Sequence, residues 1–430
     1  MDNITEVVNG GLCTGCGACC GVCPTNAIVM RVSNGLLLPR VWEDECNGCS
    51  LCLRCCPGYS LDFEKLNSEV FGRKPEDPFL GNFSGCYLAH SNDKEIQSDS
   101  SSGGTITQLL VYALEKGLID GALVARTKKG SPLESEPFIA RTREEIASAS
   151  KSKYCPVATD VALKKILSEE GRFAVVGLPC HIHGIRKAEA VFEGLKDKIV
   201  LHVGLFCGHT VDFRGTECLL RKFQVERGQI EGLDYRGKGW PGSMSIRLKD
   251  GGNLGFRFTR GWKAYWNVFS PFFFTPLRCM MCPDLFNELS DVSVGDAWLP
   301  ELRGWGSGES LVVVRTPVAE RMVRQMSKDG VLSLRAISPS KVKESQAFSL
   351  NFKKANLSGR LSLFRMLGKA TPDITPEPRR AGFLALLGAF LPYVSLRFSC
   401  SKRLSSFLAY VPLPVFRLYF GLFKCFSILS

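Results

Sequence analysis

The chain has 430 residues, with 54 lysines and arginines, 42 aspartates and glutamates, and 19 cysteines. At roughly 150 residues per domain, this length predicts about three domains. A hydrophobic content of 45% with 22% charged residues excludes wholesale disorder. The net charge of +12 is compatible with nucleic acid, an anionic membrane face, or an acidic cofactor or partner, so the position of the charges has to decide between them.

The cysteines are concentrated near the N-terminus, where ten of the nineteen lie within the first 56 residues. The first residues, MDNITEVVNGG, lack the basic and then apolar pattern of a signal peptide. We therefore expect a cytoplasmic protein with reduced thiols rather than a secreted disulfide scaffold. Metal binding or redox chemistry explains so many cysteines better than disulfide formation does.

Two runs of cysteines share the spacing C-x2-C-x2-C-x3-C-P, over residues 13–24 and 46–57. This spacing is typical of bacterial ferredoxins with two [4Fe-4S] clusters, in which the fourth cysteine of each run binds the other cluster. Gly15 and Gly17 let the first loop wrap closely around its cluster. Zinc sites are the alternative, but they usually use two CxxC pairs.

Residues 1–65 are therefore predicted to form a ferredoxin-type domain. Cys20 and Cys55 each lie beside a predicted ligand and are expected to be packing residues. One cluster is assigned to Cys13, Cys16, Cys19 and Cys56, and the other to Cys46, Cys49, Cys52 and Cys23.

Alternating strand and helix patterns follow a loop-like stretch at residues 66–85. Small residues over Ser101–Thr105 precede an amphipathic helix pattern, ITQLLVYALEKG. A helix N-terminus of this kind leaves room for a ring or a phosphate to approach the backbone. An ordinary helix N-cap is the alternative explanation of the same residues.

Two short apolar runs, FAVVGLPC (173–180) and IVLHVGLFC (199–207), predict buried strands with a helical segment between them. The carboxyl ends of strands in an open α/β sheet form a ligand crevice, so Cys180 and Cys207 are expected to lie near one another. Together with the CxxC pair Cys279 and Cys282, they supply four ligands for a third [4Fe-4S] cluster. The alternative is inert core cysteines with a CxxC pair that binds zinc or nothing.

Other patterns in the chain predict no independent site. Residues 237–242 match GxGxxG, but Pro241 and the alternating SMSIRLKDG predict a turn into a strand, which excludes a Rossmann motif. The five histidines are expected to pack or to form hydrogen bonds rather than to bind a metal. Basic and aromatic residues over 257–266 fit a solvated strand edge, and no nucleic-acid-binding motif is present.

Five segments of the central region resemble the coenzyme F420 hydrogenase/dehydrogenase beta-subunit family. The resemblance implies an α+β or α/β fold, with the N-terminal domain of the family at 80–165 and its C-terminal domain at 166–345. It also implies a bound FAD, a third cluster beside the flavin, and coenzyme F420 as the substrate that exchanges hydride. The segments are SSGGTITQLLVYALEKGLIDGALV (101–124), SKYCPVA (152–158), VVGLPCHIHGIRK (175–187), GLFCGH (204–209) and RCMMCPDLFNELSDVSVGDAW (278–298).

The family motifs also imply roles for individual residues. Asp296 and the loop at 304–308 are further flavin-site candidates, and Cys180, Cys207, Cys279 and Cys282 carry over as ligands of the third cluster. The stretch 298–305 departs from the common form, which leaves the identity of the hydride substrate open, because loops at the crevice set specificity. The residues implied near the flavin are Ser102, Gly103, Gly104, Thr105, Ser152, Lys153 and Tyr154.

The predicted function is that of an iron–sulfur flavoprotein oxidoreductase. A flavin exchanges hydride as well as single electrons, whereas iron–sulfur clusters pass one electron at a time, so FAD belongs between F420 and the clusters. The clusters would then exchange electrons with a redox partner protein or ferredoxin. Two alternatives remain at this point: a ferredoxin-dependent reductase of an organic substrate, and a non-catalytic electron-relay subunit.

The composition changes in the tail, residues 378–430. Its two uncharged runs, 381–396 and 404–416, are too short to span a bilayer, and prolines at 392, 412 and 414 interrupt them. Seven basic residues and no acidic residue follow Glu377, so the tail carries more than half of the net charge. Binding to nucleic acid is therefore not needed to explain the basic composition of the chain. We predict a helical tail on an anionic, cytoplasmic membrane face. The alternatives are a docking surface for a partner subunit and extra helices that cover the core.

Overall fold

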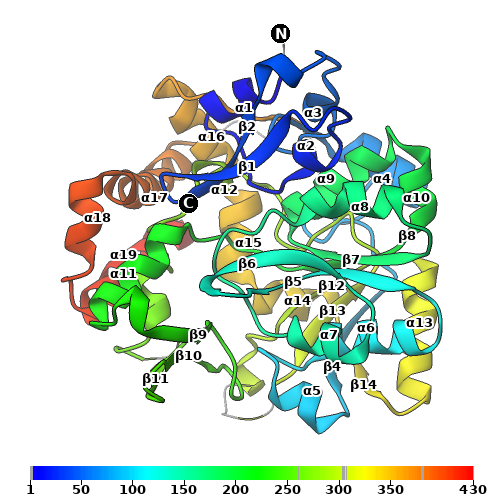
Figure 1. Cartoon of the computed structure of the whole chain (residues 1–430). Coiled ribbons are helices and arrows are strands. Elements are labelled where there is room, and N and C mark those ends of the chain that lie inside the picture. Colours follow the sequence, from blue (N-terminus) through cyan, green and yellow to red (C-terminus); the bar gives the residue numbers. More distant parts are fainter. Residues whose placement is uncertain (1–2, 260, 303–305, 307, 379–381, 430) are drawn as a thin grey trace.

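A computed structural model describes residues 3–259, 261–302, 306, 308–378 and 382–429. An eight-stranded sheet lies at the centre of the chain (Figure 1), in the order β14-β4-β13-β12-β8-β7-β5-β6. β5, β7, β8 and β12 are parallel, and the remaining strands pair antiparallel with their neighbours. This mixed sheet confirms the predicted α/β character. The strands are β4 (Gly85–Ser91), β5 (Gly121–Lys128), β6 (Ser131–Ala140), β7 (Phe173–Gly177), β8 (Ile199–Leu205), β12 (Val292–Asp296), β13 (Ser310–Val314) and β14 (Leu332–Ala336).

Helices cover both faces of this sheet, because successive side chains of a strand point to opposite sides. In β7, Ala174 packs into one apolar cluster, whereas Phe173 and Val175 pack into another on the opposite face. One face is covered by α6 (Thr105–Glu115), α7 (Arg143–Ser148) and α13 (Pro317–Lys328), and the other by α4 (Phe63–Phe71), α8 (Leu163–Ser168), α9 (Pro179–Glu189) and α10 (Glu193–Lys198). The two apolar runs that end in cysteine are therefore buried strands, as the sequence predicts.

A smaller antiparallel sheet, β11-β10-β9, lies beside the large one. The glycine-rich stretch at 237–242 leads into β10, so the predicted turn into a strand is confirmed. Tyr154, Trp266 and Phe269 join the aromatic cluster that packs on this sheet. Its strands are β9 (Ile230–Asp234), β10 (Ser243–Leu248) and β11 (Asn253–Arg257), and α11 (Phe213–Lys222) packs in the same cluster.

The N-terminal module packs directly against the central region (Figure 1). The backbone N–H of Asp160 donates to the carbonyl of Cys16 at 2.9 Å. A Cβ added at Gly21 would lie 2.1 Å from the carbonyl oxygen of Asp160, so only glycine allows this approach. The module contains α1 (Thr5–Asn9), α2 (Ala18–Gly21), β1 (Ile28–Ser33), β2 (Leu36–Val41), α3 (Leu51–Arg54) and β3 (Ser60–Asp62), which pairs with β15 (Asp373–Thr375).

The C-terminal tail is helical, as predicted, but it packs against the rest of the chain. Ser399 accepts a hydrogen bond from the backbone N–H of Phe274 at 2.7 Å, and Phe423 lies 5.4 Å from Phe272 between ring centroids. The expected interruption at Pro392 is wrong, because this proline lies inside α17. No described helix is long and apolar enough to cross a membrane. The helices after β14 include α16 (Leu357–Met366), α17 (Phe383–Cys400), α18 (Lys402–Leu408) and α19 (Leu413–Leu429).

Candidate functional site

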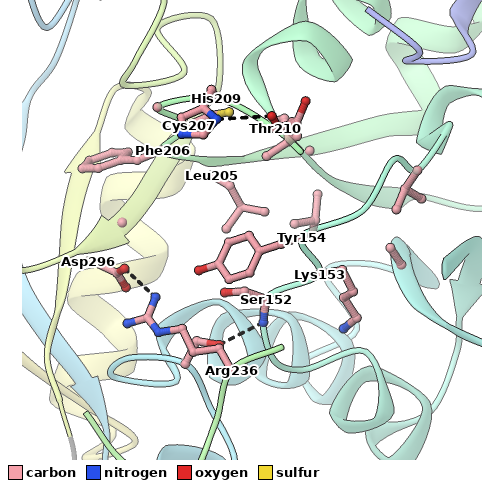
Figure 2. A pocket seen from close by; sticks show the side chains of 18 of the residues that line it. Ser152, Lys153, Tyr154, Leu205, Phe206, Cys207, His209, Thr210, Arg236 and Asp296 are labelled. Carbon is pink, nitrogen blue, oxygen red and sulfur yellow. Dashed lines mark hydrogen bonds and ion pairs between the residues drawn. The ribbon is translucent and has the colours of Figure 1, made fainter. Parts of the chain in front are cut away.

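A cavity of about 550 Å³ lies at the carboxyl ends of β7 and β8 (Figure 2). Its volume falls in the range of sites for small molecules and cofactors. The lining includes six of the seven residues implied near the flavin. The seventh, Gly103, lies in the chain between the lining residues Ser102 and Gly104. The six are Ser102, Gly104, Thr105, Ser152, Lys153 and Tyr154.

The Ser-Gly-Gly turn forms one wall of the cavity and is held tightly against the sheet. The Ser102 hydroxyl lies 2.9 Å from the Ser310 hydroxyl, which also accepts from the backbone N–H of Gly103 at 3.1 Å. A Cβ on Gly103 would lie 2.5 Å from the carbonyl oxygen of Ala89, so the turn requires glycine there. These contacts present the N-terminus of α6 to the cavity, which fits an acidic or carbonyl-bearing ligand.

The second wall is the segment at 149–155. The amino group of Lys153 donates to the carbonyls of Ala149, Ser150 and Lys151, so it holds the segment in shape. Burial lowers the pKa of Lys153 to about 8. The Tyr154 ring stacks on Phe258, which adds an aromatic surface of the kind that planar ligands bind.

Arg236 is a cavity residue that the sequence reasoning missed. Its side chain is 2% exposed, and its guanidinium binds the Asp296 carboxylate at 2.5 Å, as Figure 2 shows. Nε donates to the carbonyl of Pro241 at 2.8 Å and Tyr154 lies near the guanidinium, but Nη2 forms no hydrogen bond of normal geometry with a described residue. A buried donor of this kind fits a ligand with carbonyl or anionic oxygens.

Asp296 was a sequence candidate, and the structure places it in the cavity. Of the loop at 304–308, residues 304, 305 and 307 lie outside the described part of the chain. Gly308 is described, and a Cβ there would lie 3.2 Å from the carbonyl carbon of Ser102, so this end of the loop packs on the Ser-Gly-Gly turn.

The four cysteines predicted for a third cluster come together at the same cavity. Cys180 lies in the first turn of α9 and Cys207 follows β8, while Cys279 belongs to α12 (Leu277–Met280) and Cys282 follows it. Burial raises the pKa of Cys180 well above its usual value, and Cys207, Cys279 and Cys282 are near enough to raise it further. Four half-buried thiols in one neighbourhood provide the soft donors that an iron–sulfur cluster uses.

The structure brings the cysteines of each of the two N-terminal sets near one another. Burial and repulsion from Cys13, Cys16 and Cys56 raise the pKa of Cys19. Cys20 donates to the carbonyl of Ile28, and Cys55 is fully buried in a different apolar cluster. In the described residues, no three His, Cys, Asp or Glu side chains converge on a single-ion site. Cys23, Cys46, Cys49 and Cys52 line a second, much smaller cavity.

The three cysteine sets form a series from the cavity to the surface. Cys16 of the first set is among the groups that raise the pKa of Cys180, so the cavity set and the first set are neighbours. Cys49 of the remaining set is exposed. Arg278 links the cavity set to the first set. It donates to the carbonyl of Gly58, two residues after Cys56, at 3.3 Å and to the carbonyl of Met281, within the CxxC pair, at 2.8 Å.

Four histidines of the region form ordinary polar contacts. The nearest partner of His183 is Asp284 at 2.8 Å, and His202 lies between Glu189 and Asp291. His181 accepts from the backbone N–H of Leu178, and His209 contacts Thr275. These contacts agree with the packing and hydrogen-bonding roles that the sequence predicts.

Two family models match consecutive parts of this chain. Residues 86–164 match the model described as the coenzyme F420 hydrogenase/dehydrogenase beta subunit N-term, and 170–340 match its C terminus. The coenzyme F420 hydrogenase subunit beta of Methanothermobacter thermautotrophicus is 30% identical over 61% of this chain and 88% of its own length. The chain belongs to this beta-subunit family. The N-terminal module and the helices after residue 340 lie outside the matched ranges.

Further relatives show the range of the family. One subunit of the F(420)H(2) dehydrogenase of Methanosarcina mazei is 27% identical over 74% of this chain and 83% of its own length. The coenzyme F420-dependent sulfite reductase of Methanocaldococcus jannaschii is 27% identical over 76% of this chain and 48% of its own length. A chain of the F420-reducing [NiFe] hydrogenase complex of Methanosarcina barkeri has the same fold, with a TM-score of 0.54 and 24% identity over 70% of this chain and 99% of its own.

Proposed function

We propose that this beta-subunit family member is an iron–sulfur flavoprotein that passes electrons between coenzyme F420 and a redox partner. The observation that carries the proposal is the single cavity lined both by the implied flavin residues and by Cys180 and Cys207. Relatives named for F420 hydrogenase, F420H2 dehydrogenase and F420-dependent sulfite reductase support an F420-linked oxidoreductase.

The cavity residues would hold FAD, which when bound exchanges hydride with a substrate and single electrons with clusters. The Ser102–Thr105 turn offers backbone donors at the start of α6, and Arg236 offers a buried guanidinium edge. Tyr154 and Phe258 supply apolar ring surface and help to keep water away from the reacting face. In this proposal the residues at 102–105 and 152–154 bind and orient FAD, and Arg236 offers a positively charged hydrogen-bond donor at the edge of the FAD ring.

The cysteine sets would hold three [4Fe-4S] clusters that supply one-electron transfer. Residues 1–65 would act as a ferredoxin-type domain, and the exposed Cys49 marks the place where electrons leave or enter. The similar fold of a chain from a multi-subunit hydrogenase complex supports a protein redox partner. We keep ferredoxin and a dedicated partner subunit as the two candidates.

Anaerobic mixing of the reconstituted protein with F420H2 tests the proposal. The absorbance of the iron–sulfur clusters is expected to bleach without any added protein, because hydride transfer and cluster reduction take place in one chain. No reaction with F420H2, together with reduction by ferredoxin, would contradict the proposal and favour a ferredoxin-dependent reductase. Bleaching only with a co-purifying subunit would also contradict it and favour a relay subunit.

The outer face of the tail supports the proposed contact with an anionic membrane surface. Several large apolar side chains of α18 and α19 and of the turn between them are exposed, including Tyr410 at 82%. Basic residues lie between them, and no acidic residue follows Glu377. Exposed apolar side chains interspersed with basic residues suit the interface of an anionic leaflet. The exposed side chains are Leu404, Phe407, Tyr410, Val415, Leu418 and Leu422.

The triple variant Phe407→Ser, Tyr410→Ser, Leu418→Ser is expected to co-sediment with phosphatidylserine vesicles about 10-fold less than the wild type, or less still. The reason is that apolar area is lost from the membrane interface. These positions are exposed, so the fold is preserved, whereas deletion of the tail would also remove the core residues Phe416 and Phe423. The control is Val318→Ser, at an exposed position on α13. Equal sedimentation of the wild type and the triple variant would contradict the membrane contact.

A further inference from the structure

A buried lysine contacts the cavity cysteine set from outside the matched family ranges. Lys353 belongs to the π-helix Asn351–Ala355 and is 1% exposed. Its positive charge lies near Cys282, Cys207 and Cys279. π-helical turns of this kind occur frequently at functional sites.

A cluster bound to the cysteine set would supply the counter-charge of Lys353. No described carboxylate lies within ion-pair distance of Lys353, whereas its neighbour Lys354 pairs with Glu288 at 2.6 Å. A buried ammonium group is stable only with a compensating charge or hydrogen bonds. The thiolates of a bound cluster are the negative groups in the right place to provide that charge.

Arg360 fixes the position of the lysine relative to the cysteines. It is 2% exposed and donates to the carbonyl of Met280, inside the CxxC pair, at 2.7 Å. The same guanidinium donates to the carbonyls of Phe352 and Asn356 on either side of Lys353. The CxxC loop and the π-helix are therefore held together, so the distance between the lysine and the thiols is set by the fold.

We propose that Lys353 is a positioning residue that raises the reduction potential of the third cluster. Reduction adds one electron to a buried group that is already anionic, and a fixed positive charge stabilises the more negative state. Net charge and hydrogen bonds to the sulfurs are known determinants of cluster potential. The inference rests on the proposed function, since it requires the third cluster.

The test is a redox titration of the full-length, reconstituted protein followed by electron paramagnetic resonance. Lys353→Met keeps most of the side-chain volume and removes the charge. One of the three cluster potentials is expected to fall by at least 59 mV, which is a tenfold change in a one-electron equilibrium, while the other two stay unchanged. Lys353→Arg, which keeps the charge, and Lys369→Met, which removes an exposed charge, should both retain the wild-type potentials.

Iron content separates the possible failures of this test. A Lys353→Met protein with about twelve irons and unchanged potentials would overturn the proposal. Loss of one cluster from Lys353→Met but not from Lys353→Arg would support it, because only the arginine keeps a positive charge and N–H donors beside the cysteines. Loss from both would overturn it in favour of simple packing. A wild-type protein with only about eight irons would instead remove the third cluster from the proposed function.

Discussion

Replacing Cys180 by serine is expected to stop electron transfer from the cavity to the N-terminal cysteine sets. Cys180 lines the cavity, and its thiol lies near Cys207 and Cys279 on one side and near Cys16 of the first set on the other. A hydroxyl is a poor ligand for iron, so the third cluster should be lost or become labile. The path from flavin to the remaining clusters would then have a gap at its first step.

The measurement is stopped-flow mixing of the variant with F420H2 under anaerobic conditions. Flavin reduction should persist, whereas the rate of cluster bleaching should fall on the order of 100-fold or more. The iron content should drop from about twelve to about eight per chain. Cys218→Ser is the control, because Cys218 is a buried cysteine that belongs to the aromatic cluster of the small sheet rather than to the cavity. Unchanged bleaching in Cys180→Ser would remove this cysteine from the path.

Replacing Arg236 by methionine is expected to weaken FAD or F420H2 binding by about 10- to 100-fold, the effect of losing a charged hydrogen bond. The guanidinium is buried in the cavity wall, and its Nη2 has no protein partner of normal geometry among the described residues. Aromatic rings surround it, with Phe258 at 4.5 Å and Trp240 at 5.1 Å from its central carbon. A ligand oxygen that replaces water there would accept a strong, charge-assisted hydrogen bond from the guanidinium, in a site shielded from solvent.

The readouts are the FAD content after dialysis and the KM for F420H2. An increased KM with a normal FAD content would place Arg236 at the substrate, and loss of FAD would place it at the flavin. Arg236→Lys keeps the charge but not the planar fork, so it should recover binding only in part. The control is Arg247→Met, which changes a half-exposed arginine on β10 of the same small sheet. Normal FAD content and normal KM in Arg236→Met would contradict the assignment.

Local patterns were enough to predict several elements correctly. The apolar runs before Cys180 and Cys207 form the buried strands β7 and β8, because a strand buried on both faces needs continuous apolar side chains. The helix after the Ser-Gly-Gly turn begins at Thr105, where small residues permit the chain to bend. The helices of the tail were harder to predict, because proline disfavours the interior of a helix. Pro392 nevertheless lies inside α17, which packs on α16.

The sequence by itself predicted iron–sulfur chemistry for the cysteines, because ligand spacing is a property of a few neighbouring residues. It also determined the family, and it predicted the loops that line the cavity, since those motifs are short and local. Only the tertiary structure decided that Arg236 meets Asp296, 60 residues away, and that Lys353 meets Cys282. Neither residue belongs to a motif, and its role depends on burial and on partners from distant segments. The basic tail likewise acquired an inner packing face and an exposed apolar face only when its helices met the core.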